Sequence, residues 1–250
     1  ENVHQSATIP AGKNITLDLN GHTLSMTQAI TNKGEFKLVD SSIDKTGLLK
    51  NTKTTALVNQ GNMTLDGVTV NAAGHGITAN SGTGTIDINN SKITGASYGI
   101  NMTSGQTINL NSGLVQGSTY GIYQYGSFNG IINMTGGEVI ATVDKGIYSY
   151  CGSSSYLQKV NITGGKVTGK EYGIDANYRA TVTISNAEVI TQASNRDKYA
   201  IRLGAYSNLT INDGALISSP TASGVILDSS NITFTMNGGE INAGGSNAYG

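Results

Sequence analysis

The sequence is poor in the residues that usually cross-link a small domain through disulfides or fill a large hydrophobic core. It contains no tryptophan, three phenylalanines, two prolines and one cysteine in 250 residues. A single cysteine cannot form an internal disulfide, so the fold must be stabilised in another way. We expect Cys151, which follows a tyrosine, to be an exposed and incidental small residue, because no His and Asn partners accompany it.

Charge is also scarce, since charged residues make up 12% of the chain and the formal net charge is −1 at pH 7. This balance does not suit a nucleic acid or an anionic membrane surface, so neither is expected as a partner. No apolar run approaches the roughly 20 residues of a membrane-spanning helix, which predicts no membrane insertion in this segment. No signal peptide is recognisable either.

What the sequence does have is a short repeat rich in Gly, Asn, Thr and Ser. Its clearest copy is Tyr98–Ser118, in which three extended runs are separated by polar corners that contain glycine. One corner of each repeat carries Gly or Ala followed by an aliphatic residue: Ala29-Ile30, Ala56-Leu57, Gly76-Ile77, Gly99-Ile100, Gly121-Ile122, Gly146-Ile147, Gly173-Ile174, Ala200-Ile201 and Gly224-Val225.

A second signal consists of apolar residues at positions i, i+2 and i+7. It occurs at Leu17/Leu19/Leu24, Phe36/Leu38/Ile43, Met63/Leu65/Val70, Ile86/Ile88/Ile93, Ile108/Leu110/Val115, Ile132/Met134/Val139, Val160/Ile162/Val167, Val182/Ile184/Val189, Leu209/Ile211/Leu216 and Phe234/Met236/Ile241. The i, i+2 spacing places both side chains on one face of a strand. No stretch sustains helical spacing, and the abundant residues are poor helix formers.

One such unit cannot bury its apolar side alone, whereas stacked units form a continuous core with parallel pairing between equivalent strands. The sequence therefore predicts an all-β, right-handed, single-stranded parallel β-helix (a solenoid) of about ten turns, with three short strands per turn. A leucine-rich repeat lacks its consensus here, and a propeller blade needs about 40 residues. The chain stops at the first letters of a further repeat, so we expect 1–250 to be one domain excised from a longer protein.

The first repeat carries a family resemblance. Its segment Ile-Pro-Ala-Gly-Lys-Asn-Ile-Thr-Leu-Asp-Leu-Asn-Gly-His-Thr-Leu, residues 9–24, resembles the opening turn of β-helix regions in large surface proteins of Gram-positive, gut-type bacteria. The later Tyr-Gly-Ile turns resemble the wider pectate-lyase-like superfamily. The resemblance implies an extracellular location, on the bacterial cell surface or secreted. It does not imply one activity, because the superfamily contains lyases, hydrolases, phage tailspikes and inert stalks.

Enzyme motifs are weak in this chain. Gly74-His75-Gly76 matches a turn of β-helix polygalacturonases, but the Asn-Thr-Asp, Asp-Asp and Arg-x-Lys motifs of those enzymes are absent, so His75 is interpreted as a corner residue. A lyase would need clustered carboxylates for calcium and a basic residue. Asp175 and Asp228 lie two expected turns apart, a marginal spacing for a glycosidase pair. No catalytic residue, metal site or cofactor is predicted. We interpret 29–55 as a solvated, mildly basic loop face.

The candidate site is a group of outward positions that follow the buried aliphatic of each turn. They are Asn101, Tyr123, Tyr148, Asp175 and Arg202, and two positions further on lie Thr103, Tyr125, Tyr150, Asn177 and Gly204. Successive turns lie about 4.8 Å apart, so the four tyrosines should form a compact plate with Asp175 and Arg202 at ion-pair distance. Tyr156, Tyr178, Arg179 and Tyr206 are expected on adjoining loops.

Tyrosine surfaces suit sugar rings, although stacked tyrosines also stabilise a β-helix surface without any ligand. The candidate ligand-binding residues are Tyr123, Tyr125, Tyr148, Tyr150, Asp175, Asn177 and Arg202. We expect a non-enzymatic adhesin or stalk segment that presents this face to a polysaccharide or to host surface or matrix glycan. A carbohydrate-active enzyme, lyase or hydrolase, working on the same face is the alternative, and a pure spacer is the third possibility.

Overall fold

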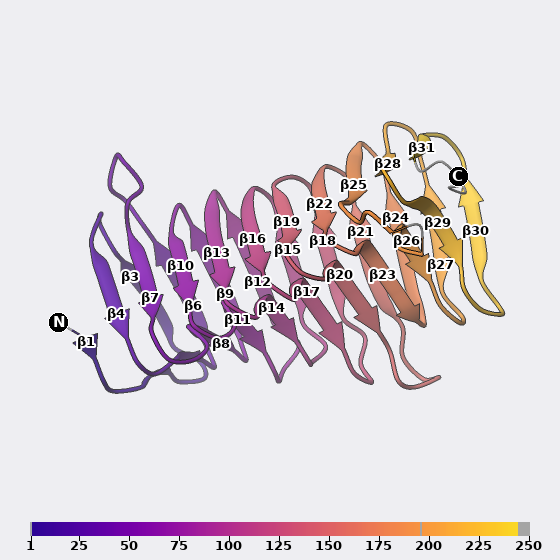
Figure 1. The fold of residues 1–250 in the computed structure, drawn as a ribbon. Coiled ribbons are helices and arrows are strands. Elements are labelled where there is room, and N and C mark those ends of the chain that lie inside the picture. The colour runs from indigo at the N-terminus through magenta and orange to yellow at the C-terminus, as the bar shows by residue number, and fades with distance from the viewer. Residues whose placement is uncertain (1, 196, 245–250) are drawn as a thin grey trace.

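In the computed structural model, which describes residues 2–195 and 197–244, the chain winds into a rod of stacked turns (Figure 1). The described residues form strands and turns, and none belongs to a helix. Each turn contributes one strand to each of three sheets, and strands of neighbouring turns pair in parallel. This confirms the predicted parallel β-helix of about ten turns with three strands per turn.

The three sheets run along the rod. The first contains β1 (Asn2–Val3), β4 (Thr23–Met26), β7 (Leu48–Asn51), β10 (Thr69–Ala72), β13 (Ser91–Gly95), β16 (Gly113–Gly117), β19 (Glu138–Ala141), β22 (Gly165–Gly169), β25 (Ala187–Thr191), β28 (Leu216–Ser219) and β31 (Glu240–Ala243). The second contains β2 (Ala7–Ile9), β5 (Ile30–Asn32), β8 (Leu57–Asn59), β11 (Ile77–Ala79), β14 (Tyr98–Met102), β17 (Tyr120–Tyr125), β20 (Lys145–Tyr150), β23 (Tyr172–Tyr178), β26 (Tyr199–Leu203) and β29 (Ser223–Leu227). The third contains β3 (Asn14–Asp18), β6 (Glu35–Val39), β9 (Asn62–Asp66), β12 (Thr85–Asn89), β15 (Thr107–Leu110), β18 (Ile131–Met134), β21 (Gln158–Ile162), β24 (Ala180–Ile184), β27 (Asn208–Ile211) and β30 (Thr233–Met236).

The apolar repeat becomes columns of buried side chains along the axis. In the second sheet the column is Ile77, Ile100, Ile122, Ile147, Ile174 and Ile201, all in register and fully buried. Burying one such side chain is worth about 1.5–3 kcal/mol relative to exposing it. The stacked columns therefore supply the stability that the sequence cannot obtain from disulfides.

The Gly or Ala before each aliphatic is explained by the close approach of the next turn. A Cβ on Gly121 would lie 2.7 Å from the carbonyl oxygen of Gly146 and 2.5 Å from Cγ1 of Val139. The equivalent residues Ala56 and Ala200 are buried. This corner therefore admits small residues and positions the strand that follows it.

The first copy of the predicted apolar motif is placed two residues too late. Ile15 and Leu17 pair with Phe36 and Leu38, so Leu19 lies beyond the end of β3.

Two further members of the predicted motif are wrong. Ile43 is 95% exposed, and its place in the core is taken by Leu49, which is buried and pairs with Val70. Near the C-terminus Ile217 faces the core in place of Leu216. In both turns extra residues in the preceding corner move the inward position, which a fixed i+7 spacing cannot anticipate.

Two further predictions are wrong, namely that 29–55 is a loop and that Cys151 is exposed. The stretch 29–55 contains β5, β6 and β7, and lysines such as Lys37 and Lys50 occupy outward positions of these strands rather than a loop. Cys151 is fully buried, because the in–out alternation of β20 continues for one residue beyond the strand. Its Sγ lies 3.5 Å from the carbonyl oxygen of Ser153.

A buried carboxylate organises the inserted corner between β6 and β7. Asp40 is 1% exposed, and its Oδ1 accepts hydrogen bonds from the N–H groups of Gly21 at 2.7 Å and Ser42 at 3.1 Å. Its Oδ2 accepts one from the N–H of Gly47 at 2.5 Å. Burial alone would raise the pKa of Asp40, but these donors outweigh burial and lower the pKa to about 2.

We expect Asp40 to hold this corner only while it is ionised. A carboxyl whose pKa is lower in the folded state than the ordinary value of about 3.9 stabilises the fold above that value, and the contribution is lost as the pH falls through about 2. An NMR titration of the Asp40 carboxyl checks this, and a midpoint near the ordinary value would contradict it. At neutral pH, Asp40→Asn should increase proteolytic cleavage within 41–47, and an unchanged cleavage pattern would count against the anchoring role.

No helix among the described residues is long and apolar enough to cross a membrane.

Candidate functional site: a tyrosine face on the second sheet

The predicted outward column is present on the second sheet. Its members pair in register from turn to turn, in the order Asn101, Tyr123, Tyr148, Asp175 and Arg202. Two positions further along the strands, Tyr125 pairs with Tyr150. The alternation of strand side chains and the parallel register together bring these residues to one surface.

The four tyrosines form the predicted tyrosine plate, Tyr123, Tyr125, Tyr148 and Tyr150. The ring centroids of Tyr123 and Tyr148 are 5.4 Å apart with an interplanar angle of 11°, and those of Tyr125 and Tyr150 are 4.9 Å apart at 16°. Within β17, Tyr123 and Tyr125 are 5.6 Å apart at 16°. These separations lie in the range of favourable aromatic pairing.

Sequence reasoning missed that Tyr98 and Tyr120 belong to the same surface. Their ring centroids lie 5.0 and 4.9 Å from that of Tyr123. Tyr98 begins β14 and Tyr120 begins β17, and two consecutive inward residues, such as Gly121 and Ile122, follow each tyrosine. Because the alternation is broken there, two residues that are three positions apart, such as Tyr120 and Tyr123, point to the same outward side. We call the outward side of β14, β17, β20, β23 and β26 the tyrosine face.

His75, interpreted from the sequence as a corner residue, stands in line with these two tyrosines and stacks on Tyr98 with a centroid distance of 4.5 Å. Burial lowers the pKa of His75, which favours the neutral imidazole. The ring therefore continues the aromatic column by one turn.

Ring faces on this surface are largely covered by neighbouring rings. Tyr123 has four tyrosine neighbours at 4.9 to 5.6 Å, so its edge and hydroxyl are the parts turned to solvent. Tyr125 and Tyr206, at the margin of the face, are 43% and 44% exposed. Burial raises the pKa of Tyr120 and Tyr148 and raises that of Tyr123 to about 12. These three phenols therefore stay protonated at neutral pH and can both donate and accept hydrogen bonds.

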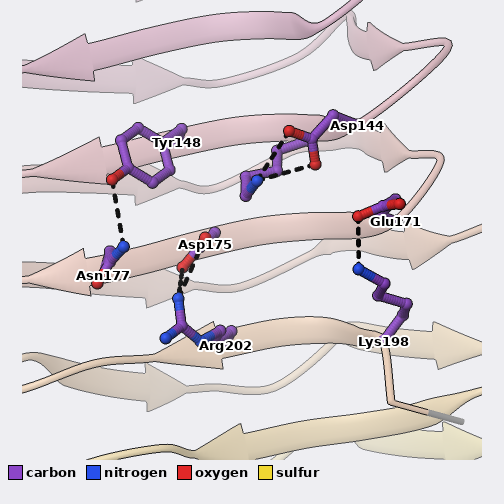
Figure 2. Close-up of polar contacts among 8 residues, drawn as sticks. Asp144, Tyr148, Glu171, Asp175, Asn177, Lys198 and Arg202 are labelled. Carbon is purple, nitrogen blue, oxygen red and sulfur yellow. Dashed lines mark hydrogen bonds and ion pairs between the residues drawn. The ribbon is translucent and has the colours of Figure 1, made fainter.

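Asn177 lies one column away from its predicted place. The register between β20 and β23 shifts at Ser149 and Tyr150, so Tyr178 pairs with Tyr150 in place of Asn177. Asn177 instead donates from Nδ2 to the hydroxyl of Tyr148 at 3.2 Å (Figure 2). Tyr178, expected on a loop, therefore extends the aromatic surface, and its ring centroid lies 5.7 Å from that of Tyr150.

The predicted ion pair between Asp175 and Arg202 is present, with Nη1 3.2 Å from Oδ1 (Figure 2). Asp175 is 1% exposed, so it lies beneath the face and does not border it as expected. Nη2 of Arg202 also contacts Oδ2 of Asp228 at 2.7 Å, so one guanidinium binds both carboxylates. Burial raises the pKa of Asp175, and the positive charges of Arg202 and Lys145 offset part of that rise.

Two lysine–carboxylate pairs on this face were not predicted. Lys145 occupies the position of a tyrosine between Tyr120 and Tyr172. Its Nζ lies 2.8 Å from Asp144 and 5.3 Å from the ring centroid of Tyr172. Figure 2 also shows the second pair, in which Nζ of Lys198 lies 2.6 Å from Glu171. Three of the four residues lie on corners, where sequence spacing gives no register, whereas Lys145 begins β20 in register with Tyr120 and Tyr172.

The arrangement suits hydrogen bonding and aromatic contact better than proton transfer. Lys145, Lys198 and Arg202 are each neutralised by a carboxylate. Among residues 2–195 and 197–244, no three His, Cys, Asp or Glu side chains gather closely enough to hold a metal ion. What the tyrosine face offers a ligand is therefore a flat array of phenol hydroxyls and ring edges.

No protein-family model matches this sequence, and neither a curated protein nor a solved structure matches it. The structure supports the parallel β-helix fold, and a relationship to bacterial surface proteins or to the pectate-lyase-like superfamily stays a prediction.

Proposed function

We propose that this chain is a non-enzymatic, rigid segment of an extracellular bacterial protein, an adhesin or stalk at the cell surface or secreted, and that its tyrosine face binds carbohydrate. One observation carries the proposal. A continuous surface of phenol rings extends over successive turns of the second sheet, from Tyr98 to Tyr178. The resemblance of residues 9–24 to bacterial surface proteins supports the location.

The chemistry of the face fits a hydroxyl-rich polymer. Phenol groups and the amide of Asn177 can donate to and accept from sugar hydroxyls. The half-exposed ring of Tyr125 offers apolar surface for the C–H face of a sugar. The strands beneath are hydrogen-bonded to both neighbouring turns, so little ordering is required when a ligand binds.

The enzymatic alternative finds less support in the same residues. A glycosidase needs two carboxylates about 5 to 9.5 Å apart that face the substrate. Asp175 is buried, and Arg202 binds both it and Asp228. An acid held in this way is poorly placed to reach a sugar.

The proposal predicts that Tyr148→Ala/Tyr150→Ala weakens glycan binding by more than tenfold. Removing one central aromatic of an interface often costs about 2 kcal/mol or more, and about 1.4 kcal/mol corresponds to tenfold. The measurement is a glycan and host-matrix array probed with the wild-type fragment and the double variant, each verified by circular dichroism.

The matched control is Ile140→Ala, an outward apolar residue of β19 on the first sheet, which should bind as the wild type does. If the folded wild type binds no glycan and no matrix protein, the ligand-binding proposal fails and the segment is a spacer. If the double variant binds normally, the tyrosines serve as a stacking ladder and the contact lies elsewhere.

A further inference from the structure

One corner of the solenoid places bulky side chains where the backbone favours Gly or Asn. Arg179, after β23, and Tyr206, after β26, have φ values of +48° and +58°. The next turn has Asn231 there, with φ +57°. Asn adopts the left-handed region readily, whereas Arg and Tyr do so at a cost in backbone energy.

These three residues lie one above another. The N–H of Arg179 donates to the carbonyl oxygen of Ala205, and that of Tyr206 donates to the carbonyl oxygen of Ser230. The same corner is therefore built with Asn on one turn and with Arg and Tyr on the two turns before it. The backbone conformation of this corner does not require Arg or Tyr. The contacts of the Arg179 and Tyr206 side chains therefore indicate what these residues do.

The Arg179 guanidinium is held among aromatic rings at the margin of the tyrosine face. Its central carbon lies 4.8 Å from the ring centroid of Tyr206 and 5.6 Å from that of Tyr178. Its one side-chain hydrogen bond among the described residues runs from Nη1 to the carbonyl oxygen of Ser154 at 3.4 Å. Its Nε is buried without an acceptor.

Charge sets Arg179 apart from the other cations of the face. Lys145, Lys198 and Arg202 each have a carboxylate within 3.2 Å. Within the described part of the chain, Arg179 makes no ion pair, and most of its N–H donors remain unused. It is thus an uncompensated positive charge beside a surface whose other positive charges are neutralised.

We infer that Arg179, flanked by Tyr178 and Tyr206, recognises the oxyanion of an acidic sugar, a carboxylate or a sulfate, in a polysaccharide bound on the tyrosine face. The inference rests on the proposed function and names the class of ligand. The planar guanidinium fork matches an oxyanion with two parallel hydrogen bonds. The exposed ring of Tyr206 provides apolar surface for the sugar that carries this group.

The decisive variant is Arg179→Asn, because Asn231, two turns further on, adopts a similar φ of +57° at the equivalent position. It removes the guanidinium and relieves the backbone, so the melting temperature should be unchanged or higher. Arg179→Lys keeps the positive charge but loses the planar guanidinium that binds an oxyanion with two parallel hydrogen bonds, so it should retain part of the preference for acidic ligands. Lys92→Asn, which removes an exposed cation on β13 of the first sheet, is the matched control.

The probes are polygalacturonic acid, its carboxyl-reduced neutral form, dextran sulfate and dextran, with affinities measured by biolayer interferometry at two salt concentrations. The wild type and Lys92→Asn should bind an acidic polymer at least about tenfold more tightly than its neutral counterpart, a difference of about 1.4 kcal/mol. The preference should decrease with salt and disappear in Arg179→Asn. The two acidic polymers distinguish a carboxylate from a sulfate.

Equal binding of acidic and neutral polymers by the wild type would overturn the inference and leave the proposed function standing. A preference that survives in Arg179→Asn would also overturn it. A melting temperature clearly lower in Arg179→Asn would identify the side chain as a structural clamp on the corner that contains Ser154, against the inference. Binding to none of the four polymers would overturn the inference, and the glycan and host-matrix array then decides separately whether carbohydrate binding fails as well.

Discussion

Replacing Gly169 by alanine is expected to destabilise the solenoid by at least about 3 kcal/mol, the upper end of the usual cost of overpacking. A Cβ at this position would overlap the carbonyl oxygen of Tyr172 and lie 2.8 Å from the backbone nitrogen of Gly146 on the previous turn. Both obstacles are backbone atoms, so no side-chain rotation relieves the clash. The corner between β22 and β23 would have to open, and β23, one of the strands of the tyrosine face, begins at that corner.

The chain contains a matched control for this substitution. Gly117 is equivalent to Gly169, with the same overlap against Tyr120, and it pairs in register with Ala141. The corner after Ala141 has one residue more before its strand begins, so a methyl group fits there. Ala141→Gly should therefore cost only about 1 kcal/mol, from backbone entropy and lost burial. Urea unfolding of both variants tests the pair, and similar small losses would contradict the steric explanation.

The fold was predictable because one physical rule is repeated in every turn. Alternating apolar residues, such as Ile108 and Leu110, specify a strand face, and each turn templates the next through parallel pairing. Errors arose where corner length varies. Leu49 takes the core position predicted for Ile43 because eight residues, 40–47, separate β6 from β7, and no local pattern marks how many of them belong to the corner.

The residues of the candidate site that lie within strands could be predicted from the sequence. Tyr123 and Tyr148 follow the buried aliphatics at a fixed distance, so their pairing could be read directly from the sequence. Asn177 was misplaced because a register shift within β20 and β23 leaves no mark in the composition. Lys145 was missed because it stands at a tyrosine position of β20, so the column of aromatic residues is interrupted there. Whether the face binds a ligand is a separate matter that the binding experiments decide.

Replacing Arg202 by alanine is expected to cost about 3–5 kcal/mol of unfolding free energy, because it leaves a buried carboxylate without its partner. The side chain of Asp175 is 2% exposed, and Arg202 is the cation that forms an ion pair with it. The matched control is Asp228→Ala. The Asp228 side chain is 45% exposed, and its loss leaves the Asp175–Arg202 pair in place, so a cost of only about 0.2–1 kcal/mol is expected.

The pH dependence of the Arg202→Ala defect identifies its cause. Burial already raises the pKa of Asp175, and loss of the Arg202 charge should raise it further. A carboxyl whose pKa is higher in the folded state than in the unfolded state stabilises the fold most at a pH below the unfolded value of about 3.9, and that stability is lost as the pH rises through the folded pKa. The defect should therefore be smallest near about pH 4 and full near about pH 7, and Asp175→Asn should restore part of the stability in the same background. Chemical unfolding at both pH values tests this: a defect independent of pH would mean that Arg202 acts through packing of its aliphatic stem and not through the charge of Asp175.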